Sequence, residues 1–218
     1  MNRCIGIISY FPDNLREDRR NRFRKLLVQL NTFFKLPIII IAQNWIQEDL
    51  EIFRGLENQT FTIYEYPKLG ITMARGVLRK VFLESDYDWL IMFDDDMEII
   101  EDQNLVNKWL GEIKDKDFYW TQTFLTNFCA ISKKGFSKID YDYEIDPSKG
   151  NGFEDWVFTQ KCIAKLPCKP FETYLPARTR RGFLNDSKST WDPLDPDLKR
   201  RNEDASRRKI YDIWAGKA

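Results

Sequence analysis

The sequence predicts an α/β protein with a mostly parallel central sheet flanked by helices, and with a C-terminal extension. Two observations predict this class. Short apolar, β-branched runs alternate with amphipathic segments of helical period along roughly the first 165 residues. The segments between the first runs are long enough for helical crossovers, so these runs are expected to pair in parallel through right-handed βαβ units.

The expected strands are recognised by apolar runs that end in turn signals. The run Pro37–Ala42 contains four consecutive isoleucines, which is typical of a strand buried on both faces. The first run ends at Pro12-Asp13-Asn14, a turn signal. The six expected strands are Cys4–Phe11, Pro37–Ala42, Thr60–Tyr66, Trp89–Phe93, Phe118–Phe124 and Phe128–Ser132.

The expected helices are recognised by apolar residues at helical spacing. In Arg16–Lys35, five such residues share one face: Phe23, Leu26, Leu27, Leu30 and Phe34. Thr72 is the predicted N-cap of a helix that ends near Glu84, with Met73, Val77, Val81 and Phe82 packing inward. The other expected helices are Trp45–Leu56, Leu105–Ile113, Glu154–Ala164 and Asp204–Trp214; Lys133-Lys134-Gly135 is expected to be a turn and Asp140–Gly152 a loop.

Composition excludes several classes of function. Lysine and arginine number 34, equal to aspartate and glutamate, so no general attraction to nucleic acid or acidic membrane is indicated, although a local patch is not excluded. No apolar run reaches the ~20 residues that span a bilayer. The first residues resemble a strand more than a signal peptide, so a cytoplasmic location is expected.

The absence of histidine excludes Ser-His and Cys-His catalysis. The four cysteines form no C-x-x-C pair, so a structural zinc site is not expected, and the thiols are expected to be reduced and mostly buried. A general base near neutral pH must then be a carboxylate, lysine, tyrosine or cysteine.

Carboxylates cluster directly after the apolar run Trp89–Phe93, at Asp94, Asp95, Asp96 and Glu98. In open α/β sheets, ligands bind at the carboxyl ends of the strands, where these residues are expected. Adjacent carboxylates repel one another, and hard oxygen ligands suit Mg²⁺ or Mn²⁺. The alternative is a solvated Asp-rich turn that caps the next helix.

A second acidic site lies about sixty residues further on, in Gly150-Asn151-Gly152-Phe153-Glu154-Asp155-Trp156. Glycines precede two acids that open a helix, where negative charge is favoured. The alternative is a helix start that only complements the helix dipole. With two acidic sites in a chain without histidine, one could bind a metal ion while the other supplies a general base.

Four segments, in this order, resemble the GT-A-fold glycosyltransferases, particularly the inverting family-2-like enzymes. Cys4–Phe11 is similar to their opening nucleotide-binding strand. The segment Gly70–Gly76 resembles their Gly…Ala-Arg-Asn segment, with Gly76 in place of Asn. Phe93–Asp96 is similar to the Asp-x-Asp motif, and Cys129–Trp156 to the acceptor-side strand followed by the Glu-Asp helix.

The resemblance implies a role for each matching residue. Asp94 and Asp96 would hold Mn²⁺ or Mg²⁺, which bridges the donor diphosphate, and Asp155 would be the general base, with Glu154 beside it. The donor-binding residues would be Ser9, Phe11 and Asp13 at the nucleobase, together with Arg75, Asp94 and Asp95; Arg178 and Arg181 would belong to a lid over the diphosphate. For Arg75 the alternative is a surface arginine, and for the arginine segment it is a solvated loop.

The implied protein is a single glycosyltransferase domain, 1–218. Residues 1–100 would bind the nucleotide sugar, 101–171 would form the acceptor side, and 172–218 the lid and extension. Gln43-Asn44 replaces an acid that is often found after the second strand, so the base is left open, with a UDP-sugar expected. The acceptor is also left open.

Three alternatives bear on the function. The acceptor could be a glycan hydroxyl or, because of the basic C-terminal segment, a hydroxylated base in DNA. Among enzymes, the closest rival is a nucleotidyltransferase, whose usual Gly-rich, Lys-containing loop is lacking at Pro12–Leu15. The other rival is a non-catalytic carbohydrate- or Ca²⁺-binding module. The sequence does not indicate the oligomeric state.

Overall fold

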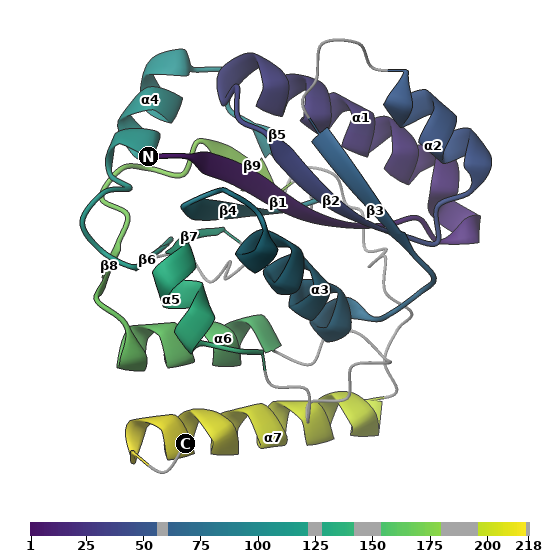
Figure 1. Ribbon diagram of the computed structural model, residues 1–218. Coiled ribbons are helices and arrows are strands. Elements are labelled where there is room, and N and C mark those ends of the chain that lie inside the picture. Colours follow the sequence, from purple (N-terminus) through teal and green to yellow (C-terminus); the bar gives the residue numbers. More distant parts are fainter. Residues whose placement is uncertain (56–60, 122–127, 142–153, 180–195, 217–218) are drawn as a thin grey trace.

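The computed structural model has a central sheet with helices on both faces (Figure 1). The structure describes residues 1–55, 61–121, 128–141, 154–179 and 196–216. Within this part, seven strands form the sheet in the order β3-β2-β1-β4-β7-β6-β8. Their bounds are β1 Arg3–Tyr10, β2 Ile38–Gln43, β3 Phe61–Tyr66, β4 Trp89–Asp94, β6 Phe118–Trp120, β7 Cys129–Ser132 and β8 Cys168–Pro170.

The first four strands form a parallel half, as predicted. β1 pairs in parallel with β2 and with β4, and β2 pairs in parallel with β3. The direction reverses at β7, which is antiparallel to both β4 and β6. A second, two-stranded sheet joins β5 (Met97–Ile99) to β9 (Ala177–Thr179), a pairing that the sequence did not suggest.

Helices cover both faces of the sheet. α1 and α2 lie on one face, α3, α5 and α6 lie on the other, and α7 lies outside α6 (Figure 1). The helix bounds are α1 Arg16–Phe33, α2 Gln47–Arg54, α3 Ile71–Glu84, α4 Gln103–Gly111, α5 Lys133–Lys138, α6 Glu154–Lys165 and α7 Pro196–Trp214; a 3-10 turn, η1, spans Asp13–Leu15. No described helix is long and apolar enough to cross a membrane.

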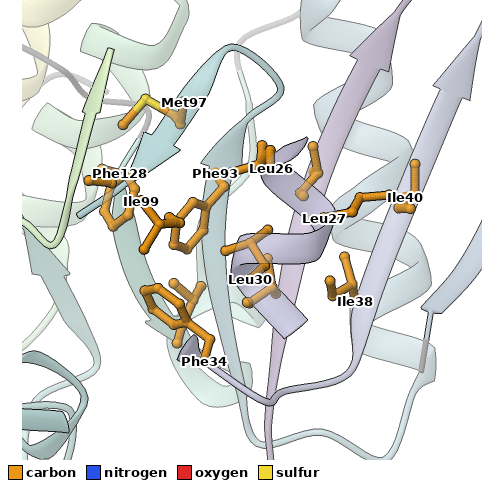
Figure 2. Close-up of a cluster of buried hydrophobic side chains, with 14 of the residues drawn as sticks. Leu26, Leu27, Leu30, Phe34, Ile38, Ile40, Phe93, Met97, Ile99 and Phe128 are labelled. Atoms are coloured by element: carbon orange, nitrogen blue, oxygen red, sulfur yellow. The ribbon is translucent and has the colours of Figure 1, made fainter. Parts of the chain in front are cut away.

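Side chains alternate along the strands, so the two faces have separate cores. On one face, the predicted apolar stripe of α1 packs against β2 and β4, and Figure 2 shows Leu26, Leu30 and Phe34 lying toward Ile38 and Phe93. On the other face, α3 packs on β1 at Gly6, where an added Cβ would lie 2.8 Å from Leu90 and 2.9 Å from Leu78. The glycine therefore lets α3 approach the sheet closely.

The sequence prediction was wrong in detail at the start of α3. Gly70, with φ 82°, precedes the helix, and Thr72 lies within it and is buried. Glycine adopts positive φ without steric cost, so the turn into α3 falls on Gly70. Met73, which was predicted to pack inward, is 41% exposed, whereas Arg75 is buried.

Two further expectations are corrected. The predicted turn at Lys133–Gly135 is the first turn of α5, because the Ser132 hydroxyl accepts a hydrogen bond from the Gly135 N–H at 2.9 Å and caps it. The C-terminal helix begins at Pro196 and not at Asp204, and proline suits the first helical position.

The predicted free thiols are confirmed: three of the four cysteines are buried.

Asp49 joins the first two helices. Its carboxylate is fully buried and lies 2.6 Å from a guanidinium nitrogen of Arg16 and 2.7 Å from one of Arg20. It also accepts a hydrogen bond from the Ile46 N–H at 2.9 Å. Asp49→Ala is expected to lower the free energy of unfolding by about 3 kcal/mol, because two largely buried cations lose their buried partner and keep only the exposed carboxylates of Asp13 and Glu48.

Glu48→Ala is the matched control for Asp49→Ala in urea denaturation. Glu48 binds Arg20 at 2.7 Å, but its side chain is 63% exposed. The control is expected to cost less than about 1 kcal/mol. Equal effects of the two substitutions would contradict a special role for the buried carboxylate.

Candidate active site

The candidate site lies at the edge where the four parallel strands end. β1 ends at Tyr10, β2 at Gln43, β3 at Tyr66 and β4 at Asp94, and the register places these ends side by side. Ligands of open α/β sheets bind at this edge.

The three aspartates form the connection between β4 and β5, and not the start of a helix. Asp94 is the last residue of β4, Asp95 and Asp96 form a turn, and Met97 begins β5. Asp96 is 8% exposed. The alternative of a solvated turn that caps a helix is therefore wrong.

Several charges converge on Asp94. Burial raises the pKa of Asp94 well above its usual range, and the nearby Asp96 raises it further. Arg75 lowers that pKa, whereas Asp95 and Asp155 raise it. Asp155 belongs to the first turn of α6, so the fold brings the two acidic sites of the sequence within electrostatic reach of each other.

Arg75 is buried at this site. It lies on α3 and is 3% exposed. Its charge lowers the pKa of Asp94 and also that of Cys129 on β7, although burial raises the Cys129 pKa more, to about 12. The alternative of a surface arginine is therefore wrong, and Arg75 places a positive charge beside the acidic turn.

Asp95 points to the opposite face of the sheet. Its carboxylate lies 3.2 Å from a guanidinium nitrogen of Arg19 on α1 and accepts a hydrogen bond from the Tyr10 N–H at 3.2 Å. Burial raises the pKa of Asp95, and Arg19 opposes that rise. Asp95 therefore lies on the face of α1, whereas Asp94 lies on the face of α3.

The three residues predicted at the nucleobase also lie apart from the acids of the α3 face. Ser9 and Phe11 are fully buried, and the Phe11 ring stacks on Trp45 with centroids 4.8 Å apart. Asp13 is exposed and pairs with Arg16 at 2.6 Å. Their contact with a nucleobase stays a prediction, and in this arrangement the Phe11 ring belongs to the core.

Sequence reasoning assigned no binding role to two polar side chains on the α3 face of the same edge, Tyr10 and Gln43. Tyr10 lies beneath Lys68, whose Nζ is 5.3 Å from the ring centroid. Gln43 is fully buried; its Oε1 accepts a hydrogen bond from the Leu69 N–H at 2.9 Å, whereas its Nε2 has no partner in the described part of the chain. The pairing of Ile8 with Asp94 and of Tyr10 with Gln43 places these residues on one face, which a single strand pattern cannot reveal.

Some predicted residues cannot be placed. Arg181 lies outside the described residues, as do the side chains of Glu154 and Arg178. The backbone of Arg178 lies in β9, opposite Glu98 of β5. Their roles stay predictions.

The acidic turn fits a divalent cation that is shared with a substrate. No group of three or more histidine, cysteine, aspartate or glutamate side chains among the described residues is arranged to hold a metal ion by itself. Mg²⁺ in phosphate-binding sites is commonly held by one or two carboxylates together with substrate oxygens and water. Half-buried Asp94 and buried Asp96, which lie within electrostatic reach of each other, match that donor set.

Comparisons with known proteins support the fold. No protein-family model matches the sequence, and no curated protein matches it. A solved structure of TarS residues 1–349 from S. aureus, in complex with UDP-GlcNAc, matches with a TM-score of 0.66 at 12% identity, over 96% of this chain and 66% of that one. The chain has the GT-A fold. At this identity the likeness concerns the fold alone.

Two other solved structures share this fold. The mannosyltransferase PcManGT from Pyrobaculum calidifontis, in complex with GDP-Man and Mn²⁺, matches with a TM-score of 0.53 at 10% identity, over 78% of this chain and 54% of that one. A putative glucose-1-phosphate thymidylyltransferase from Bacillus anthracis matches with a TM-score of 0.53 at 11% identity, over 96% and 99%. The chain spans only 43% of the longer TarS structure.

The raised pKa of Asp94 predicts a conflict between stability and function. Because the folded protein holds this proton more tightly than the unfolded chain, ionised Asp94 opposes folding above the unfolded pKa of ~3.9, and the penalty vanishes below it. In buffer with a chelator, so that no metal ion is bound, Asp94→Asn is expected to raise the free energy of unfolding by about 1 kcal/mol near neutral pH.

Urea denaturation at several pH values measures this gain, which should shrink toward zero as the pH falls to ~4. Asp86→Asn, an exposed aspartate at the opposite edge of the sheet, is the control. A loss of stability in Asp94→Asn at neutral pH would show that favourable contacts of the carboxylate outweigh its burial.

Proposed function

We propose that this protein is a metal-dependent glycosyltransferase that moves a single sugar from a nucleotide-sugar donor, UDP-linked in our proposal, to an acceptor hydroxyl. One observation carries the proposal. Asp94 and Asp96 from the β4–β5 turn, buried Arg75 from α3 and Asp155 from α6 converge at the ligand-binding edge of a GT-A fold. Acids paired with one buried arginine suit a diphosphate shared with a metal ion.

The donor side would be formed by the acidic turn and α3. Asp94 and Asp96 would hold Mn²⁺ or Mg²⁺, which when bound neutralises charge on the departing diphosphate. Arg75 would face the same diphosphate, because its guanidinium already lies in the field of Asp94. Gln43 Nε2, buried without a partner in the described residues, is a donor that a base or ribose oxygen could satisfy.

The acceptor side would be formed by the start of α6. Asp155 would take the proton of the acceptor hydroxyl as that oxygen forms its bond to the anomeric carbon. The bond between this carbon and the diphosphate oxygen breaks, and the nucleoside diphosphate leaves. A single displacement inverts the anomeric centre and needs no enzyme nucleophile, in agreement with a site built from one base and a metal-binding turn. Residues 1–100 would then bind the nucleotide-sugar donor, and residues 101–171 would form the acceptor side.

Calorimetry with UDP and a transfer assay test this assignment. Asp96→Ala is expected to abolish Mn²⁺-dependent UDP binding, because half of the proposed carboxylate pair is lost. Asp155→Asn is expected to keep UDP binding and to lower turnover of a UDP-sugar by about 10²–10⁴-fold, the usual contribution of a general base.

Asp86→Asn serves as the control and should resemble the wild type in both assays. If the wild type binds no nucleoside diphosphate with any divalent metal, the proposal fails. Binding without turnover of any nucleotide sugar would favour a non-catalytic module.

A nucleotidyltransferase is the second candidate, because the Bacillus anthracis structure has the same fold. Here the segment after β1 is a 3-10 turn, Asp13–Leu15, that Pro12 precedes. It has no glycine or lysine to hold a triphosphate. Analysis of the products decides between the two: a glycosyltransferase releases nucleoside diphosphate, whereas a nucleotidyltransferase releases pyrophosphate from a nucleoside triphosphate.

The exposed side of α7 bears on the acceptor. α7 packs on α6 through Ile210, Ile213 and Val157. Its exposed side chains include arginines and two rings, Tyr211 (70%) and Trp214 (57%), of which Trp214 also donates a hydrogen bond to Gln160 of α6. The exposed arginines are Arg200, Arg201, Arg207 and Arg208. Positive charge binds phosphates and exposed rings stack on bases, so DNA with a hydroxylated base is the acceptor that α7 favours over a neutral glycan.

Retention of single-stranded DNA at low salt tests this acceptor. Arg207→Gln/Arg208→Gln is expected to weaken retention several-fold, and added salt should weaken it in the wild type, while Mn²⁺-dependent UDP binding stays unchanged. No retention by the wild type, or retention that salt does not affect, would leave a glycan as the acceptor.

A further inference from the structure

The end of β4 and the turn after it direct two neighbouring aspartates to different helices. Asp94 lies on the face of α3, where Arg75 acts on it. Asp95 turns to the face of α1, where Arg19 binds it at 3.2 Å. The aspartate between the two candidate metal ligands therefore contacts a different helix from the one that faces Asp94.

Arg19 and Asp95 form a pair with little access to solvent. Their side chains are 6% and 15% exposed, and Asp95 is the ion-pair partner that the structure gives Arg19. The second carboxylate oxygen of Asp95 accepts the Tyr10 N–H at the end of β1. Because a buried charge that loses its partner is costly, the pair is expected to hold the turn in one place relative to both α1 and β1.

The same helix continues to bind the strand beyond the turn. Lys25 pairs with Glu98 at 2.7 Å. The Gln29 side chain accepts the Ile99 N–H at 3.2 Å and donates to the Ile99 carbonyl at 3.3 Å. α1 thus contacts the connection at Asp95 and β5 further along, and Asp95 is the contact within the turn itself.

We propose that Asp95 is a positioning residue, which with Arg19 fixes the β4–β5 turn so that the carboxylates of Asp94 and Asp96 converge. It would touch neither metal nor donor. The metal-binding part of this inference rests on the proposed function. It replaces the prediction that Asp95 contacts the donor, and it adds Arg19, which sequence reasoning did not single out.

Two other roles for Asp95 make different predictions. If Asp95 were a direct ligand, removing Arg19 would leave metal binding intact, because the carboxylate would still be present. If the pair only stabilised the fold, both substitutions would lower the melting temperature, but the protein that remains folded would bind as the wild type does. A positioning pair predicts that both substitutions weaken binding in the folded protein.

The variants are Asp95→Asn, Arg19→Met and the double variant. Asparagine keeps an oxygen for the Tyr10 N–H and loses the charge, and methionine keeps length and apolar contact. Mn²⁺-dependent binding of UDP is measured by calorimetry well below each melting temperature. Each single variant is expected to bind about tenfold or more weakly, the usual effect of losing a residue that orients a metal ligand. The double variant should be no worse than the weaker single variant, because the two residues act as a unit.

Lys25→Met is the control. It removes the ion pair between Lys25 of α1 and Glu98 of β5, in which the Lys25 side chain is 51% exposed. It should leave the affinity for UDP within about twofold of the wild type. Wild-type affinity in Arg19→Met together with lost binding in Asp95→Asn would overturn the proposal in favour of a direct ligand. Wild-type affinity in both would reduce the pair to a structural role.

Amide hydrogen exchange without ligand supplies an independent measurement. Both single variants are expected to exchange faster in residues 94–99 while α3 keeps its wild-type protection. Unchanged exchange in 94–99, or a rise spread evenly over the chain, overturns the positioning role. If the wild type binds no nucleotide, the proposed function fails, and this measurement still decides whether the pair holds the turn.

Discussion

The structure depends on how it accommodates negative charge at the end of a buried strand. Asp94, Asp95 and Asp96 follow the apolar core of β4, where burial and the neighbouring carboxylates oppose the ionisation of Asp94 and Asp95. Two buried arginines approach from opposite faces, Arg75 on α3 and Arg19 on α1. The layered α/β fold makes this arrangement possible, because a helix lies on each face of the sheet at the end of β4.

The fold and the side chains at the site support different parts of the proposed function. Sugar transferases and a nucleotidyltransferase share this architecture, so the architecture leaves the reaction undecided. The proposed function rests instead on the side chains at the strand ends. A pair of carboxylates too small to enclose a metal ion, a buried arginine and a carboxylate at the start of α6 suit a diphosphate and an acceptor hydroxyl on adjoining sides of the edge.

Individual residues show where sequence reasoning reached its limit. Local rules predicted the four parallel strands and helix α1 well, because apolar period and turn residues act over a few positions. They failed at Thr72, since a helix can begin at either of two plausible residues and the positive φ of Gly70 decided the register. Whether Arg75 faces solvent or the sheet depends on how α3 packs, and in the structure it is buried. β5 was missed, because a three-residue strand has too short a pattern.

The local pattern of the chain was sufficient for the α/β class, the parallel half of the sheet and an acidic turn at a ligand-binding edge. The tertiary structure alone decided which carboxylates meet. Strand pairing sets Ile8 beside Asp94, the turn after β4 brings Asp95 to Arg19, and α6 brings Asp155 into the field of Asp94. These contacts join residues far apart in the chain, and a one-residue change of register would exchange the two faces.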